Sequence, residues 1–310
     1  MSEIIIKVDG KKIEYFDNVS FSDQIDAVSS TLSFDSFFDI KTYEFSKVEV
    51  IRDGFLLFTG KIFGKTKPED PTPKPFNYKC YLLTGILEDS ALPLEYYPIQ
   101  TKNKTLKEIV EKICGYFDIT VKIDKSATSD VNKNYTLQDQ NPDEKAIDII
   151  NKLCSQQNLI LTHNAKGELI ITKNILGSSV NYPFYLNTNK TYNYRNFYKN
   201  YVILGQQSID SETTKQATDT WASIDEKRNI TKIQSDGDAE ITDKQVKAFK
   251  YDSYKGNTFD IQFHDHFVNV GSVFVVKNVK SIVNSITYNY KSGGETCSVS
   301  LLNVKVYERN

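Results

Sequence analysis

The residues best suited to bind a metal ion are two histidines, His264 and His266, on either side of Asp265. Residues i and i+2 of a strand point to the same face, so the two imidazoles would share a face and the carboxylate would point away. Zinc needs three or four ligands, and the only other histidine, His163, is far away in the sequence. A polar loop between strands explains this run better, and the sequence predicts no metal site and no cofactor.

Paired carboxylates are the second arrangement that could do chemistry, because glycoside hydrolysis uses two of them. The candidates are Asp35, Asp39, Glu69-Asp70 and Glu88-Asp89. A chain with 40 acidic residues offers many such pairs, and no motif fixes their geometry. A solvated turn at a strand end explains Glu88-Asp89 better than a catalytic role does.

Motifs of the common enzyme classes are absent from the sequence. It contains no GxSxG, HExxH or GxxxxGK[ST] motif and no Rossmann glycine pattern. A nucleophile and a base could still meet in space, but the sequence predicts no catalytic residue and indicates that the protein is not an enzyme. Two lysine runs are interpreted as solvated helix faces, with docking of an acidic partner as the alternative: Lys102, Lys104 and Lys107, and Lys244, Lys247 and Lys250.

The bulk composition excludes several classes of partner. A net charge of −2 and a pI near 6.0 argue against binding of nucleic acid through a basic surface. The N-terminus does not resemble a signal peptide, and no apolar stretch approaches the roughly 20 residues of a membrane span. The 19 tyrosines and 18 phenylalanines suit polar interfaces, although strand composition alone explains them equally well.

The four cysteines form no CxxC pair, and their spacing fits neither a zinc site nor a disulfide scaffold. Cys114 and Cys154 fall on apolar stripes of predicted helices, so we expect buried thiols that act as small hydrophobic side chains. This is consistent with folding in a reducing cytoplasm.

Residues 1–95 are predicted to be mainly β. The strongest signal is Val48 to Phe63, two apolar strands joined at Asp53-Gly54, because Asp-Gly tolerates the positive φ of a tight hairpin turn. Asp9-Gly10 is a second hairpin signal. Phe76 to Leu87 is predicted to be a strand, after a Pro-rich excursion at 65–75.

Residues 96–176 change to helical periodicity. A helix capped by Thr101 or Thr105 has the stripe Leu106, Ile109, Val110, Ile113 and Cys114. A second helix is predicted to start near Asn141-Pro142-Asp143. A strand at 119–123 and a hairpin at 159–172 complete a small α+β unit.

Residues 177–310 return to β, with strands predicted at 258–263, 272–276, 281–290 and 296–306. A short helix is predicted at 241–250, and the polar stretch 206–236 is predicted to be a loop. The fold class is therefore α+β and predominantly β, with β-rich segments on both sides of the α+β unit.

Four stretches, in this order, resemble the phage Mu-type baseplate hub family of contractile tails: KVEVIRDGFLLFTGKI, TLKEIVEKICGYFDITVKID, EKAIDIINKLCSQQNLILTHNAKGELIITK and VNVGSVFVVKNVKSIVNSITYNYKSGGETCSVSLLN. Each encodes a unit of secondary structure and no chemistry, so their joint order carries the resemblance. The Pro-rich loop and the 206–236 stretch have no counterpart in it.

The resemblance implies two β-barrel-like tube domains, 1–95 and 177–310, on either side of an α+β domain at 96–176. It implies a structural hub: a homotrimer that joins the sixfold tail tube to the threefold central spike and carries the spike through the host envelope. Expected partners are other copies of the chain, a tube or tube-adaptor protein, the spike and other baseplate proteins, with no nucleic acid and no integral membrane segment.

The expected location is the virion, after assembly in the cytoplasm of the host bacterium. Two alternatives remain, a tail-associated cell-wall hydrolase and a tail-tip protein that binds carbohydrate through exposed tyrosines.

Overall fold

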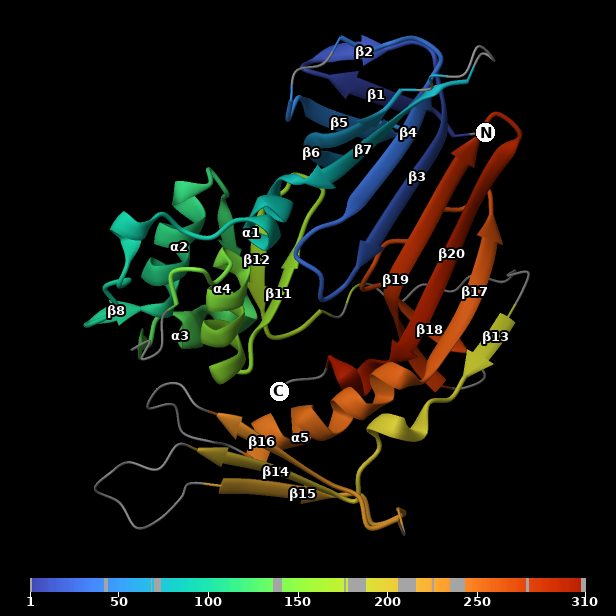
Figure 1. The fold of residues 1–310 in the computed structure, drawn as a ribbon. Helices are drawn as coiled ribbons and strands as arrows, with labels where there is room; N and C mark the ends of the chain where they lie inside the picture. Colours follow the sequence, from blue (N-terminus) through green and yellow to red (C-terminus); the bar gives the residue numbers. More distant parts are fainter. Residues whose placement is uncertain are drawn as a thin grey trace.

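The large sheet of this protein runs through both ends of the chain, and most helices gather beside it (Figure 1). The computed structural model describes residues 2–41, 44–67, 69, 74–135, 141–175, 177, 188–205, 216–224, 226–234, 243–276 and 279–307. Within these ranges, no helix is long and apolar enough to cross a membrane.

The N-terminal part of the sheet has seven strands: β1 (Ile4–Val8), β2 (Lys11–Ile13), β3 (Phe16–Gln24), β4 (Thr31–Ser36), β5 (Lys47–Arg52), β6 (Phe55–Thr66) and β7 (Phe76–Leu82). The C-terminal part adds β13 (Thr188–Thr191), β17 (Thr258–His264), β18 (Val273–Val276), β19 (Val279–Lys291) and β20 (Gly294–Asn303). The strand order is β13-β17-β20-β19-β3-β4-β7-β6-β5-β1-β2, and β18 pairs with β19.

The antiparallel pairing of β3 with β19 joins the two β-rich parts into one sheet. Strand pairing in the described part of the chain leaves this sheet open, and no barrel closure is detected. The predominantly β, α+β fold class is confirmed. The strand pairing does not separate the two β-rich parts into two barrels. β19 pairs with β20 along one edge and with β3 along the other.

The hairpin at Asp53-Gly54 is confirmed. Asp53 (φ 49°) and Gly54 (φ 80°) both adopt the left-handed conformation that the tight turn requires. Residues 47–52 pair with 55–61 across the turn. Alternate side chains of β5, Val48 and Val50, are fully buried, as a period of two predicts.

The middle of the chain folds as a separate layer of helices and short strands: α1 (Ile86–Asp89), β8 (Lys104–Thr105), α2 (Leu106–Tyr116), β9 (Val121–Ile123), α3 (Thr128–Val131), β10 (Asn134–Tyr135), α4 (Ala146–Gln156), β11 (Ile160–His163) and β12 (Leu169–Thr172). Thr105 caps α2 in a reciprocal capping box with Glu108. The predicted stripe of α2 is buried, and it forms one core with the buried side of α4.

Two local predictions in this region are wrong. The second helix begins at Ala146, because Ala146 donates a backbone hydrogen bond to Ser90 (2.9 Å) and 141–144 forms a turn instead. The strand that starts at Phe76 ends at Leu82, where a short 3₁₀ helix (Leu83–Gly85) leads into α1.

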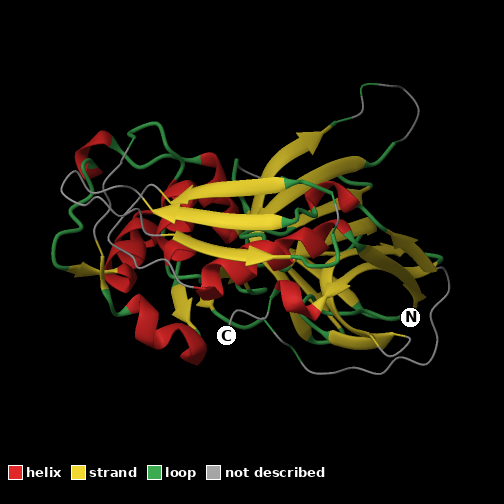
Figure 2. Ribbon diagram, turned by 90° about the horizontal axis from the view of Figure 1, so that it is seen from below, coloured by secondary structure: helices red, strands yellow, loops and turns green. Residues whose placement is uncertain are grey.

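Part of the predicted polar loop belongs to a separate three-stranded sheet. This sheet consists of β14 (Asn200–Gly205), β15 (Gln216–Thr220) and β16 (Asn229–Gln234), with α5 (Asp243–Tyr251) packed against it (Figures 1 and 2). The loop prediction is therefore wrong for 216–220 and 229–234. The first segment pairs with β14 as an antiparallel strand, and the second pairs with β14 as a parallel strand. Residues 206–215, 225 and 235–242 lie outside the described part, whereas the predicted helix near 241–250 is confirmed from Asp243.

Candidate assembly surface

One face of the central strands is polar, and we call it the polar sheet face. Three rows of paired residues cross it from β4 to β17: Thr31, Ser22, Thr287, Ser298 and Gln262; Ser33, Ser20, Asn289, Thr296 and His264; and Gln24, Ser285, Ser300 and Asp260, with Asn189 of β13 beside Asp260. All of them are exposed or half-buried, while the residues between them along each strand are buried, except for the half-buried Asp23.

This face is polar and almost free of charge. Among the residues of these rows Asp260 is the only carboxylate, and none is Lys or Arg. Hydroxyl and amide groups link neighbouring strands: Ser20 Oγ donates to Asn289 Oδ1 (2.8 Å), and Ser300 Oγ donates to Asp260 Oδ1 (2.7 Å). A hollow of about 360 Å³ lies over β13, β17, β20 and β19 on this face. Such a surface offers hydrogen bonds but no reactive group.

A buried ion pair holds the N-terminal hairpin against the last hairpin of the chain. Arg52 Nη2 donates to Glu295 Oε2 (2.9 Å), and Glu295 also accepts from Tyr288 Oη (2.7 Å) and the Ser2 amide (2.8 Å). Burial works against the charge of Glu295, but these hydrogen bonds outweigh it and lower its pKa to about 2. The network fixes two regions that are more than 200 residues apart in sequence.

His163 connects the middle layer to the large sheet. Its side chain is only 4% exposed, and its Nδ1 donates to the Ala27 carbonyl (2.9 Å). Nε2 faces Ser30 Oγ (2.6 Å) and Asp23 Oδ1 (2.9 Å), which lie on the connection between β3 and β4 and on β3 itself. His163 therefore makes a structural contact between β11 and the β3–β4 region.

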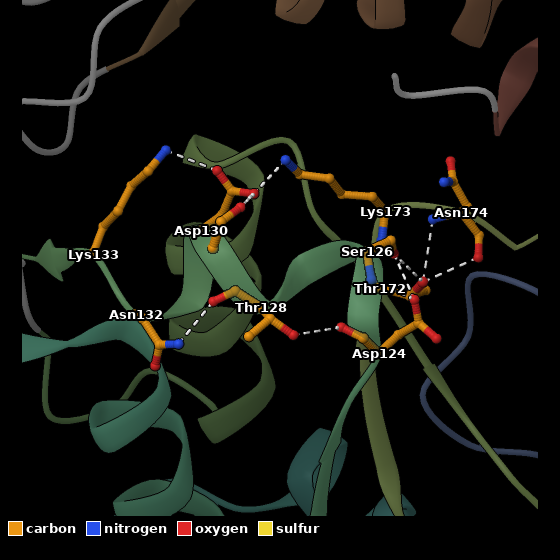
Figure 3. A network of polar contacts seen from close by, with 10 residues as sticks. Asp124, Ser126, Thr128, Asp130, Asn132, Lys133, Thr172, Lys173 and Asn174 are labelled. Carbon is orange, nitrogen blue, oxygen red and sulfur yellow. Dashed lines mark hydrogen bonds and ion pairs between the residues drawn. The ribbon is translucent and has the colours of Figure 1, made fainter.

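A second polar network, drawn in Figure 3, ties the segment 124–133 to the end of β12. Ser126 Oγ donates to Asp124 (2.6 Å) and accepts from the Lys173 amide (3.1 Å). Asp130 is buried and accepts from Lys133 (2.7 Å) and Lys173. Burial disfavours its charge, but the two lysines outweigh this and lower the pKa of Asp130. This network braces the point where the chain leaves the middle layer.

The sequence-derived candidates for chemistry do not come together. His264, Asp265 and His266 are exposed at the end of β17, and no group of three or more possible metal ligands occurs among the described residues. Asp35 accepts from Asn18 and Asn77 (2.8 Å each), and Asp39 pairs with Lys65. Both carboxylates thus serve structural contacts.

The remaining acidic candidates are at α1 and beside the Pro-rich excursion. Glu88 and Asp89 lie on α1, where burial and the charge of Asp89 raise the pKa of Glu88. Glu69 is described, whereas Asp70 lies outside the described residues. No described contact brings a second carboxylate opposite Glu88 from another element.

The lysine runs have two different environments. Lys104 and Lys107 make surface pairs with Glu108 (3.6 Å) and Glu111 (3.8 Å), as expected of solvated helix faces. Lys250 differs, because it pairs with Asp219 (2.9 Å) and lies 4.3 Å from the centroid of the Trp221 ring. For Lys250 the solvated interpretation is wrong.

All four cysteines are buried and free, as expected. Burial raises the pKa of the Cys80 and Cys114 thiols to about 12 and that of Cys297 to about 11, and it raises the pKa of Cys154 as well. A thiol with a raised pKa and no access to solvent reacts poorly. The native cysteines are therefore packing residues.

Several aromatic side chains are exposed, and the sequence alone could not say which of its many aromatic residues these would be. Those in the described ranges include Tyr15, Phe37, Phe38, Phe45, Phe55, Phe63, Tyr116, Tyr192 and Tyr194. Large exposed aromatic groups near polar surface are typical of protein interfaces. Together with the polar sheet face, they indicate a protein built for assembly.

The middle of the chain matches a known protein family. Residues 84–173, which include α1 to α4 and β8 to β12, match the family model described as "Baseplate hub protein gp44-like, second domain". The chain contains a gp44-like baseplate hub domain. This match confirms the resemblance to the Mu-type baseplate hub family for residues 84–173, which are similar to the second domain of a baseplate hub protein.

The rest of the fold around the gp44-like domain is also shared with tail proteins. The structure is similar to the 43 kDa tail protein of prophage MuSo2 from Shewanella oneidensis (TM-score 0.79, 15% identity, 99% of both chains). It is similar to a tail protein from Neisseria meningitidis (TM-score 0.79, 13% identity, 99% of this chain and 98% of that one). Prophage tail protein gp18 from Listeria monocytogenes is more distant (TM-score 0.61, 9% identity, 96% and 94%).

At these identities the likeness concerns the fold alone. A search of curated protein sequences finds no significant match.

Proposed function

We propose that this protein is the trimeric hub of the baseplate, an adaptor that joins the sixfold tail tube to the threefold central spike. The observation that carries the proposal is the arrangement of the central layer. Four strands from the N-terminal part (β6, β7, β4, β3) continue into four from the C-terminal part (β19, β20, β17, β13). Three copies would supply six four-stranded units, which is what a threefold protein needs to match a sixfold ring.

The polar sheet face supports the same function. A surface of hydroxyl and amide groups with little charge neither attracts nor repels a charged polymer strongly, and it presents no exposed apolar patch to it. Such a surface suits the inner wall of a channel, because molecules that move along it would bind to it only weakly. We therefore propose that the polar sheet face is turned toward the inside of the ring.

The buried networks support a mechanical role. Arg52 and Glu295 connect the two ends of the chain, and His163 anchors the gp44-like domain to the large sheet. We propose that the chain has three domains, 1–95, 96–176 and 177–310, and that mechanical load is transmitted between them.

The oligomeric state tests the proposal. Light scattering of the purified protein is expected to give three times the chain mass of 35.4 kDa, and electron micrographs are expected to show rings. A monomer at every concentration tested would overturn it.

The two alternatives are tested on the same sample. A hub is expected to leave purified peptidoglycan intact and to bind no cell-wall glycan. Lysis by a monomer would favour the hydrolase. Glycan binding that is lost in the double variant Tyr192→Ala and Tyr194→Ala would favour the carbohydrate-binding protein, because these two exposed rings stack in parallel (6.3 Å, 6°).

A further inference from the structure

Two short stretches at opposite ends of the central layer have an unpaired backbone edge. β13 pairs through Thr188–Thr191 with β17 on one side, and no described strand lies on its other side. β6 pairs with β5 only as far as Lys61, so its last residues, 63–66, have β7 on one side and no described strand on the other. A free edge is a template for another strand.

The two edges bound the same layer. Between them lie β17, β20, β19, β3, β4 and β7, and the polar sheet face extends over the first five of these strands. β6 pairs with β7 on both sides of the irregularity between Ile62 and Gly64, but it pairs with β5 only before it. Setting β13 of one copy beside 63–66 of another would therefore continue the layer.

We propose that these two edges form the seam between neighbouring subunits, with Thr188–Thr191 of one copy pairing with residues 63–66 of the next. The inference rests on the proposed trimer and assigns its contact. The two edges are similar in length: Thr188–Thr191 on β13, and on β6 residues 64–66, which pair with β7, together with the bulge residue Phe63. The two edges are different surfaces, and repeated pairing of unlike surfaces can close into a ring.

Each edge also carries exposed aromatic side chains that need a partner. Phe63 is 52% exposed and stacks on Tyr81 (5.3 Å) on the β6 side. Tyr192 directly follows β13, is 59% exposed and stacks on Tyr194. Every residue from 188 to 196 is exposed. Burial at a seam would remove both aromatic groups from water, which is where Tyr and Phe contribute most to association.

Another open edge, β2 at the far end of the sheet, fits less well. It lies beyond β5 and β1, outside the layer that carries the polar sheet face (Figure 1). Its exposed residues include Lys11 and Lys12, and lysines on an edge strand are a common protection against pairing. It therefore serves as the control edge.

Disulfide trapping in the full-length protein tests the seam. Because the native cysteines are buried, engineered surface pairs report with little background. All pairings in this layer are antiparallel, so β13 of one copy would run antiparallel to residues 63–66 of the next. The double variants Asn189→Cys with Lys65→Cys, and Lys190→Cys with Gly64→Cys, place one thiol on each proposed edge in that register. The control variant Lys190→Cys with Lys12→Cys uses β2 instead. The single variants measure random collision.

Under mild oxidation at least one seam pair is expected to give a covalent ladder that stops at three chains, while the β2 pair gives no more product than the single variants. A wild-type trimer whose seam pairs all fail to cross-link, or which cross-links through β2, overturns the seam and leaves the trimeric hub intact. A wild-type monomer overturns both.

A second measurement does not depend on the choice of register. Phe63→Asp or Tyr192→Asp is expected to weaken trimer formation at least tenfold in a dilution series. Phe55→Asp, at the exposed tip of the β5–β6 hairpin and outside the seam, is expected to change it less than twofold. Equal effects of all three substitutions, or none, would overturn the seam.

Discussion

Glu295 is a buried charged residue, only 2% exposed to solvent. A buried carboxylate is stabilising only when its hydrogen-bond partners are complete, and Arg52, Tyr288 and Ser2 supply them. The folded pKa of about 2 lies below the ordinary value of 4.5. Ionised Glu295 therefore favours the folded state.

The pH dependence follows from this lowered pKa. The stabilisation is fully present above about pH 4.5, where the unfolded chain is also ionised, and it is lost as the pH falls toward 2. The size of the shift corresponds to about 3 kcal/mol. Denaturant unfolding is expected to show Glu295→Gln much less stable than wild type at pH 7, with the difference falling to about 1.5 kcal/mol at pH 3, because one unit above its folded pKa the carboxylate is still mostly ionised. Glu3→Gln, at an exposed acid beside Ser2, is the control and should match wild type throughout.

At this scale the sequence predicts residue types but not partners. The buried environments of Cys114 and Cys154 followed from helical spacing, and they are confirmed. His163 received no role, because Ala27 and Ser30 lie more than 130 residues away and only the fold brings them together. Lys250 was interpreted as solvated for the same reason, since Trp221 comes from another element.

At the scale of elements, β6 contains two glycines with opposite tolerance. A Cβ added at Gly60 would lie 2.0 Å from the Tyr81 carbonyl oxygen and 2.5 Å from the Phe58 ring. A Cβ at Gly64 would make an ordinary contact, 3.5 Å from Lys79 Cβ. The strand can pack against β7 and its own neighbours at Gly60 only without a side chain.

Gly60→Ala is therefore expected to lower the free energy of unfolding by about 3 kcal/mol or more, because a backbone atom must move. Gly64→Ala is the matched control in the same strand and is expected to stay within about 0.5 kcal/mol of wild type. Denaturant titrations of both variants measure the difference. Equal stability of the two alanine variants would contradict the close packing of β6 on β7.

Elements whose signals are local were predicted well. The hairpin at Asp53-Gly54 and the helix capped by Thr105 need only their own residues to be recognised, and both are confirmed. The strands at 216–220 and 229–234 were missed because their sequences are polar and β14 selects them as partners. The start of α4 was misplaced because Ser90, from another segment, holds Ala146.

For the whole molecule, the decisive contact is one that no local pattern contains. β3 and β19 are more than 250 residues apart, yet they pair over six positions and make one sheet from two β-rich parts. The sequence indicates β-rich parts on both sides of the middle unit, and the family resemblance implies two β-barrel-like domains there, but no barrel closure is detected. Pairing partners of strands are set by the tertiary fold, so this continuity could not be derived from alternation alone.

The distribution of buried residues predicts how the molecule comes apart. One core mixes N-terminal residues such as Phe21 with C-terminal residues such as Tyr288, whereas the core of the gp44-like domain consists almost entirely of that domain's own residues.

Fragment 84–175 is therefore expected to fold alone, with a helical circular dichroism spectrum and a cooperative thermal transition. Its midpoint should fall below that of the full chain, because His163 loses Ala27 and Ser30. Fragment 1–83 is the comparison: without β19, one side of β3 has no partner and its core is open, so it should remain unfolded or aggregate. A folded 1–83 together with an unfolded 84–175 would contradict this division of the core.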